Sequence, residues 1–195
     1  MTTVGVLGLQ GDVREHLATL GEIGVTGVQV KTRAQLSEID GLIIPGGEST
    51  TIAKLARIFD LFEPIRAAIG TGLPTFGTCA GLILLADRIV DGIEGQETFG
   101  GLDVTVQRNA FGHQSESFET TLAFEGVDGE GVSAAFIRAP IITEVGPKAH
   151  ALAALGDGRV VAVRQGNLLG ISFHPEITGE NRVHEYFLNE FVNKA

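Results

Sequence analysis

Short apolar runs alternate with amphipathic stretches through the first half of the chain. Residues 4–9 carry no charged side chain, as in strands that are buried on both faces of a parallel sheet. Val13, Leu17, Leu20 and Ile23 then recur at the spacing of one helix face. These two patterns predict a buried strand followed by an amphipathic helix.

The same alternation continues to about residue 85. Further apolar runs predict strands over residues 28–30, 41–44 and 73–76. A helix is expected after the second of these strands, with Ser49 or Thr50 as its N-cap, and another begins at Ala80 and reaches Leu85. Strands that alternate with helices favour a parallel sheet with helices on both faces.

The second half of the chain has a different pattern, with many strands and few helical intervals. Strands are predicted over residues 102–107, 118–124, 132–137, 159–164 and 168–173. A closing helix over about residues 180–192 would bury Val183, Phe187, Phe191 and Val192. Because strands without helical crossovers pair antiparallel, this half predicts an antiparallel or mixed addition to the sheet. With no internal repeat or linker, residues 1–195 are expected to form one α/β domain.

Composition narrows the class of protein. The 195 residues are 44% hydrophobic and 19% charged, which excludes a disordered chain and a coiled coil. The net charge of −10, without a run of Lys or Arg, argues against nucleic acid and anionic membranes as partners. No signal peptide or membrane span is expected, and the single cysteine excludes an internal disulfide. A cytoplasmic location is the simplest expectation.

Three loops with unusual chemistry follow predicted strands. They are Gln10-Gly11-Asp12, Pro45-Gly46-Gly47-Glu48-Ser49 and Gly77-Thr78-Cys79-Ala80-Gly81. In open α/β sheets, ligands bind at the carboxyl ends of the strands, near a switch in strand order. We therefore expect these three loops to meet at one site.

The third loop has the spacing of a nucleophile elbow, G-x-C-x-G. A sharp strand-to-helix turn needs small residues two positions before and after the nucleophile, here Gly77 and Gly81. Cys79 would lie at a helix N-terminus, where the helix dipole favours the thiolate form. The alternative is a buried structural cysteine in a glycine-rich turn.

A cysteine nucleophile needs a base, and His174 is the best candidate among five histidines. His174 ends a predicted core strand, and Pro175 fixes the backbone so that Glu176 can turn back to orient the imidazole. His16 and His184, on predicted helices, are expected to be solvated or capping residues. The other two histidines lie in loop-like or alanine-rich segments.

The second loop supplies backbone donors. Two glycines, Gly46 and Gly47, allow N–H groups to point into a site, as an oxyanion hole requires. A phosphate-binding loop is the competing interpretation, but no lysine follows as a P-loop would need. No group of His, Cys, Asp and Glu has the sequence spacing of metal ligands, so no metal site is expected.

Taken together, these motifs resemble the class I, triad-type glutamine amidotransferases, and among them the glutaminase subunits of pyridoxal 5′-phosphate synthases. The resemblance spans nearly the whole chain. Its segments are residues 4–11, Pro45-Gly46-Gly47-Glu48-Ser49-Thr50-Thr51, Phe76-Gly77-Thr78-Cys79-Ala80-Gly81, Arg108-Asn109-Ala110-Phe111-Gly112, Phe136-Ile137-Arg138-Ala139-Pro140 and Phe173-His174-Pro175-Glu176. One position departs from the family pattern, since His113 stands where an arginine is common.

The resemblance implies a three-layer, flavodoxin-like fold with a mixed, mainly parallel sheet. It also implies that Cys79 is the nucleophile on glutamine, that His174 is base and then acid, and that Glu176 orients His174. Substrate-binding positions would be Gly46, Gly47, Glu48, Ser49, Arg108, Ile137 and Arg138. An arginine suits the α-carboxylate of glutamine, and an acceptor such as Glu48 suits its α-ammonium group.

The family hydrolyses L-glutamine to L-glutamate and ammonia without a cofactor, and passes the ammonia to a synthase subunit that makes pyridoxal 5′-phosphate. The resemblance therefore implies a hetero-oligomeric partner, without which the glutaminase is weak or inert. A flip of a peptide in the two-glycine loop could account for this dependence. Gln10-Gly11-Asp12 is a candidate link between the docking face and the site.

Three alternatives stay open at this point. A glutaminase that feeds imidazole glycerol phosphate synthesis would share the elbow and His174, although the segment Phe136–Pro140 favours the pyridoxal phosphate interpretation. A cysteine hydrolase or chaperone on a similar sheet would lack the distant His-Pro-Glu. A glutamine-sensing subunit would use Cys79 only structurally.

Overall fold

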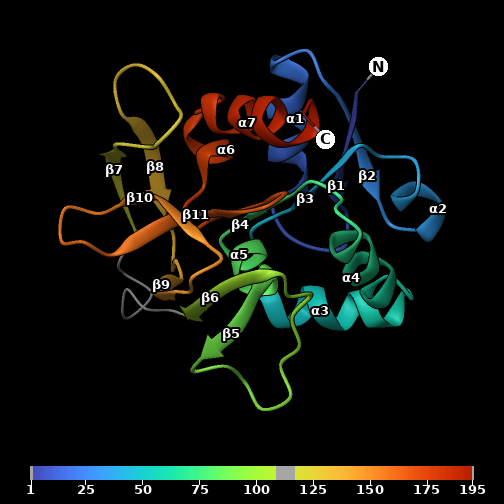
Figure 1. Ribbon diagram of the computed structural model, residues 1–195. Helices are drawn as coiled ribbons and strands as arrows, with labels where there is room; N and C mark the ends of the chain where they lie inside the picture. The colour runs from blue at the N-terminus through green and yellow to red at the C-terminus, as the bar shows by residue number, and fades with distance from the viewer. Residues whose placement is uncertain (1, 109–116, 195) are drawn as a thin grey trace.

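The computed structural model describes residues 2–108 and 117–194 (Figure 1). In this part of the chain ten strands form one sheet, in the order β2-β1-β3-β4-β12-β11-β9-β6-β5, with β10 beside β11. The strands are β1 (Thr3–Leu7), β2 (Thr26–Val30), β3 (Gly41–Ile44), β4 (Thr75–Thr78), β5 (Ala86–Val90), β6 (Leu102–Gln107), β9 (Ile141–Val145), β10 (His150–Ala154), β11 (Val160–Gln165) and β12 (Leu168–Ile171). A separate antiparallel pair is formed by β7 (Phe118–Leu122) and β8 (Val132–Phe136).

The sheet is mixed, as the sequence predicts. The five strands from β2 to β12 pair in parallel, with Gly5 of β1 opposite Val28 and Leu42, and Ile171 of β12 opposite Thr78. Beyond β12, the pairs β12·β11, β11·β9 and β9·β6 are antiparallel. The last pair, β6·β5, is parallel again. The α/β fold with a mainly parallel half and an antiparallel addition is therefore confirmed.

Helices cover both faces of the sheet (Figure 1). One face holds α1 (Val13–Glu22), α6 (Pro175–Thr178), α7 (Arg182–Phe187) and the π-helical turn Leu188–Val192. The other holds α3 (Ser49–Ile58), α4 (Phe62–Gly70) and α5 (Ala80–Leu85). Short α2 (Arg33–Leu36) follows β2 and contacts that strand.

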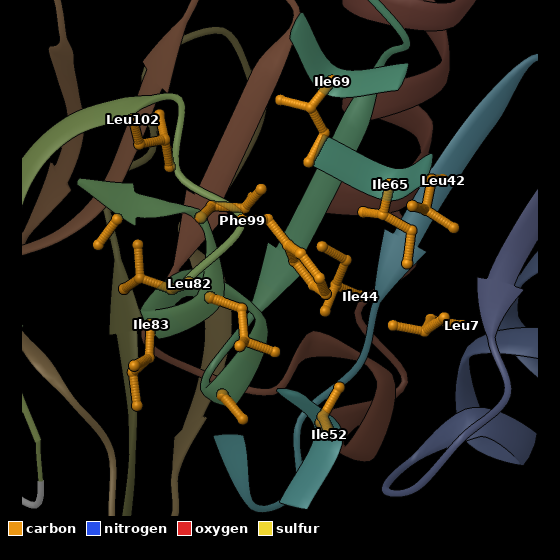
Figure 2. Packing of buried hydrophobic residues seen from close by; sticks show 14 of the residues in the cluster. Leu7, Leu42, Ile44, Ile52, Ile65, Ile69, Leu82, Ile83, Phe99 and Leu102 are labelled. Carbon is orange, nitrogen blue, oxygen red and sulfur yellow. The ribbon is translucent and has the colours of Figure 1, made fainter. Parts of the chain in front are cut away.

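Alternation along the buried strands builds the two cores. Ile43 of β3 packs with α7, whereas Leu42 and Ile44 pack with α3 and α4. Figure 2 shows residues of the second cluster, among them Ile44 of β3, Ile65 of α4 and Phe99. Each side chain of a buried parallel strand is thus used by one face or the other, which is why these runs are apolar throughout.

Several elements differ from the sequence-based expectation. The N-cap of α3 is Glu48 rather than Ser49 or Thr50, because the Glu48 carboxylate accepts from the Thr50 N–H at 3.4 Å. The expected closing helix over about residues 180–192 is α7 followed by the π-helical turn Leu188–Val192. Six elements were not anticipated, namely α2, α4, α6, β5, β9 and β10. The three strands among them mix buried and exposed positions, which gives weak patterns.

The chain directions diverge at two places at the carboxyl ends of the strands. β1 leads to α1 on one face, whereas its neighbour β3 leads to α3 on the other. β4 leads to α5, and its neighbour β12 leads to α6 on the opposite face. Connections that part in this way leave room for a ligand between them. The three loops singled out by the sequence all lie here.

None of the helices in the described ranges is long and apolar enough to cross a membrane.

Candidate active site

Cys79 occupies a tight turn between β4 and α5. Its backbone has φ 49° and ψ −101°, a conformation that a residue with a side chain adopts rarely. The Cys79 N–H donates to the carbonyl of Ile171 at 2.8 Å, which ties the turn to β12. A Cβ on Gly77 would lie 2.5 Å from the carbonyl of Gly81. The strand–turn–helix context that the G-x-C-x-G spacing predicts is therefore present. The backbone passes so close at Gly77 and Gly81 that there is no space for larger side chains at these positions.

His174 and Glu176 form a buried pair beside the elbow. Nδ1 of His174 lies 2.8 Å from Oε1 of Glu176, and both residues are less than a tenth exposed. The His174 N–H donates to the carbonyl of Ala135 in β8 at 2.9 Å, so a second strand fixes the histidine backbone. Pro175 is the first residue of α6, which turns Glu176 back toward the ring. With Nδ1 directed at Glu176, Nε2 remains for Cys79.

The pKa values of His174 and Glu176 are shifted in the directions that make these two side chains an ion pair. Burial alone would lower the pKa of His174, but its interactions with Cys79 and Glu176 outweigh burial and raise the pKa to about 11. Burial alone would raise the pKa of Glu176, yet His16 and His174 lower it to about 2. At neutral pH Glu176 is therefore a carboxylate and the ring of His174 holds its proton whenever Cys79 is a thiolate. That arrangement suits a thiol nucleophile activated by a histidine.

Asp12 adds a second carboxylate to the histidine. Its Oδ2 lies 3.4 Å from Nδ1 of His174, and burial raises the pKa of Asp12. Asp12, His174 and Glu176 bring ligand atoms within 4.8 Å of one another, a grouping that could hold a metal ion and that sequence spacing did not reveal. The carboxylate oxygens of Asp12 and Glu176 already face the Nδ1–H of His174. A metal ion bound there would replace this N–H as their partner, and the contact that orients the ring would be lost. The absence of a metal stays a prediction.

The two-glycine loop packs directly on the loop after β1. The Asp12 N–H donates to the carbonyl of Gly46 at 3.1 Å, and the Glu48 N–H donates to Oε1 of Gln10 at 2.9 Å. Gly47 has φ +149°, which favours glycine, and a Cβ there would lie 2.5 Å from Oε1 of Gln10. The loop that is expected to supply oxyanion donors is thus held by side-chain and backbone contacts of residues 10–12.

Gly46 lies against the ring of His174, the predicted base. A Cβ at this position would overlap Cε1 of His174 and lie 2.7 Å from Oδ2 of Asp12. We expect Gly46→Ala to displace the imidazole and to lower glutamine hydrolysis about 100-fold, since small misplacements of a catalytic group have effects of this size. The measurement is steady-state glutamate release.

Gly21→Ala is the matched control for this prediction. Gly21 lies on α1, where an added Cβ meets nothing within 4 Å, so this variant should keep full activity. Equal activity of Gly46→Ala and Gly21→Ala would contradict the close approach of Gly46 to His174.

Three of the other five predicted substrate-binding residues, Glu48, Ser49 and Arg108, lie in one polar cluster. Arg108 donates to Oε1 of Glu48 at 2.9 Å and to Oε1 of Gln96 at 2.9 Å, while the Gln96 amide donates to Oγ of Ser49 at 3.0 Å. Arg108 is nearly buried, and Glu48 is half exposed. Gln96 links two of these side chains, those of Arg108 and Ser49, and nothing in its glycine-rich sequence context pointed to it.

Ile137 and Arg138 lie on the exposed turn directly after β8, the strand whose Ala135 carbonyl accepts from the backbone N–H of His174. Arg138 has φ 46°, the left-handed region that only strained or tightly held residues adopt. His113, the departure from the family pattern, and residues 109–112 of the quoted motif lie outside the described residues.

The expectation for His16 and His184 is wrong. Both side chains are fully buried rather than solvated, and Nδ1 of His16 lies 2.9 Å from Nε2 of His184. The sequence did carry a signal. His16 follows Val13 by three positions and precedes Leu20 by four, which places it on the apolar face of α1.

Comparisons with known proteins agree on one class. The profile of the SNO glutamine amidotransferase family matches residues 6–193. The chain is 60% identical over 185 residues to pyridoxal 5′-phosphate synthase subunit PdxT of Leifsonia xyli, covering 95% of this chain and 93% of that protein. It is 59% identical to PdxT of Clavibacter sepedonicus, with 95% and 89% covered. A crystal structure of a glutamine amidotransferase superposes with a TM-score of 0.89 at 47% identity, covering 95% of this chain and 97% of the other.

Proposed function

This chain belongs to the SNO glutamine amidotransferase family, and on that premise we propose that it is the glutaminase subunit of a pyridoxal 5′-phosphate synthase. It hydrolyses L-glutamine to L-glutamate and ammonia and supplies the ammonia to the synthase subunit. The observation that carries this function is the pairing of His174 with Glu176 beside Cys79 at a nucleophile elbow. Relatives named PdxT over most of their length argue against imidazole glycerol phosphate synthesis as the pathway.

The reaction follows from the positions of these groups. The Cys79 sulfur attacks the side-chain amide carbon of glutamine, and backbone N–H groups around Gly46 and Gly47 stabilise the oxyanion that forms. As the carbon–nitrogen bond breaks, His174 gives its proton to the leaving nitrogen, which departs as ammonia and leaves a thioester on Cys79. His174 then takes a proton from water, whose oxygen attacks the thioester. Glutamate leaves and the thiol is restored.

The substrate is held as a zwitterion. The α-carboxylate of glutamine faces Arg108, and its α-ammonium group faces Glu48, so the ligand lies across an existing ion pair. Gln96 keeps the Arg108 guanidinium in place from the other side. Ile137 and Arg138 complete the site from the turn after β8. A zwitterion that aligns with an opposed pair of charges is favoured over an amide without charged α-groups.

The partner and the setting follow from the same premise. The synthase subunit forms a hetero-oligomer with this chain, and no nucleic acid or membrane takes part. Residues 1–195 act as a single glutamine amidotransferase domain, since the sheet takes strands from both halves of the chain. The protein works in the cytoplasm, because a catalytic thiol without a disulfide partner needs a reducing compartment. No cofactor is required for hydrolysis.

The test of this function is glutamate release from L-glutamine, measured for the chain alone and with a pyridoxal 5′-phosphate synthase subunit. Release that rises sharply with the subunit supports both reaction and pathway. Release without any effect of the subunit would keep the reaction and refute this pathway. A glutamine analogue that labels Cys79 would exclude the glutamine-sensing alternative, and a lack of labelling in the presence of the subunit would support it.

Gln10 provides a prediction about this dependence on a partner. In the free chain its side chain holds the Glu48 N–H at 2.9 Å, which keeps that donor away from a substrate oxyanion. We expect Gln10→Ala to raise hydrolysis by the free chain several-fold and to reduce the stimulation by the synthase subunit. Glutamate release with and without the subunit measures both quantities. If the synthase subunit stimulates Gln10→Ala as much as wild type, Gln10 does not connect docking of the subunit to catalysis.

A further inference from the structure

Two histidines from different helices meet in the core beneath the candidate active site. His16 lies on α1 and His184 on α7, and neither has exposed surface. Their rings pack against Phe76 of β4, and Nδ1 of His16 faces Nε2 of His184 at 2.9 Å. Burying two imidazoles is unfavourable unless their nitrogens are bonded. The mechanism described above leaves both rings unused.

The hydrogen bonds fix which nitrogens carry protons. Nδ1 of His184 has no partner among the described residues, so its proton lies on Nε2 and is donated to Nδ1 of His16. Nδ1 of His16 is then an acceptor, and its own proton lies on Nε2. Burial lowers the pKa of both residues, to about 3 for His184, and the Glu176 carboxylate opposes the effect of burial at His16.

The proton on His16 points at the catalytic elements. Nε2 of His16 lies 3.1 Å from Oγ1 of Thr78 and 3.6 Å from Oε1 of Glu176. Thr78 is the residue before Cys79, and Oε1 is the oxygen that faces His174. The direction of donation therefore runs from His184 through His16 to Thr78 at the elbow. The same Nε2–H faces Oε1 of Glu176 from 3.6 Å, an electrostatic contact longer than a hydrogen bond.

From this geometry we propose that His16 is a positioning residue for Glu176, with His184 selecting the tautomer that makes it a donor. The inference rests on the proposed glutaminase function, whose site it deepens. Oε2 of Glu176 has no hydrogen-bond partner among the described residues, so few groups hold this buried carboxylate. The Nε2–H of His16, held by Thr78 and 3.6 Å from Oε1, attracts the carboxylate and keeps it aimed at Nδ1 of His174. Residues that orient a catalytic ligand from behind commonly change activity 10- to 100-fold.

Variants at His16 test the proposal in the complex with the synthase subunit. His16→Leu removes the donor, whereas His16→Gln places an amide N–H where Nε2 lies. We expect His16→Leu to lower kcat about 10- to 100-fold with KM within twofold, and His16→Gln to restore most of the loss. His184→Leu should have an intermediate effect, because His16 is then free to change tautomer. Leu20→Ala, in the buried face of α1, is the control for destabilisation alone.

The pH profile separates positioning from packing. His174 is faced by Cys79, Glu176, Asp12 and His16. If Glu176 is misaligned, the pKa of His174 falls. The alkaline limb of the kcat–pH profile should then move to lower pH in His16→Leu. In His16→Gln and Leu20→Ala it should stay in place. Equal kcat losses and unshifted limbs in both His16 variants would overturn the proposal.

A second readout does not depend on glutamine turnover. The rate of Cys79 alkylation by iodoacetamide near neutral pH should fall in His16→Leu and recover in His16→Gln. Failure of the wild-type complex to release glutamate would refute the proposed function while this alkylation series still decides the role of His16. An alkylation rate in His16→Leu equal to wild type would refute that role.

Discussion

Replacing Cys79 by alanine should abolish glutamine hydrolysis, with a loss of at least about 10⁴-fold in kcat. The hydroxyl of Thr78, the other nucleophilic group at the elbow, is buried against His16, and the thioester cannot form without the sulfur. The fold should survive, since alanine fits the space and adopts the same strained backbone at φ 49°. Glutamate release by the complex measures the loss, and thermal unfolding confirms that the chain is folded.

Cys79→Ser is the companion to this variant. A serine hydroxyl keeps the size and hydrogen bonding of the thiol but is a much weaker nucleophile beside a histidine that is tuned to a thiolate. Serine should therefore be nearly as inactive as alanine. Hydrolysis within tenfold of wild type in Cys79→Ala would show that another group carries the reaction.

Glu176→Gln should have the second largest effect, a fall of about 10³-fold in kcat/KM, as expected when the residue that orients a catalytic histidine loses its charge. The amide can present an N–H to Nδ1 and so favour the wrong tautomer of His174. The carboxylate also supports the high pKa of His174, so the alkaline limb of the profile should move to lower pH.

The same variant should change stability against pH. The pKa of Glu176 is lowered from 4.5 to about 2, so its contribution to folding is present above pH 4.5 and is lost as pH falls toward 2. Glu176→Gln should therefore unfold with a smaller dependence on pH in that window. Urea unfolding at several pH values measures it. Parallel curves for wild type and variant between pH 2 and 4.5 would contradict the low pKa of Glu176.

Local chemistry made the elbow geometry and the pairing of His174 with Glu176 predictable from the sequence. Gly77 and Gly81 mark a turn whose crossing chains leave no space for side chains, and Pro175 starts the helix that returns Glu176 to His174. These signals lie within a few residues of the groups they position. The parallel strands were readable for a similar reason, because burial on both faces excludes polar side chains over the whole run.

Features set by distant contacts were not readable in the same way. Gln96 acquires its role only when the segment after β5 reaches α3 and Arg108. His16 and His184 follow the apolar spacing of their helices, but a histidine on such a face becomes informative only when a second ring is opposite. The edge strands β5 and β10 mix exposed and buried positions, so their patterns resemble those of loops.

The strand at the centre of the sheet is the last of the described strands to leave the ribosome. β12 inserts between β4 and β11, and both have an unpaired backbone edge on that side until it arrives. Cys79 ends one of the waiting strands, whereas His174 follows β12 itself. A nascent or truncated chain that stops before residue 168 therefore carries the thiol without its base and exposes strand edges that can pair with other chains. The pairing of β12 that closes the sheet therefore also brings His174 to Cys79.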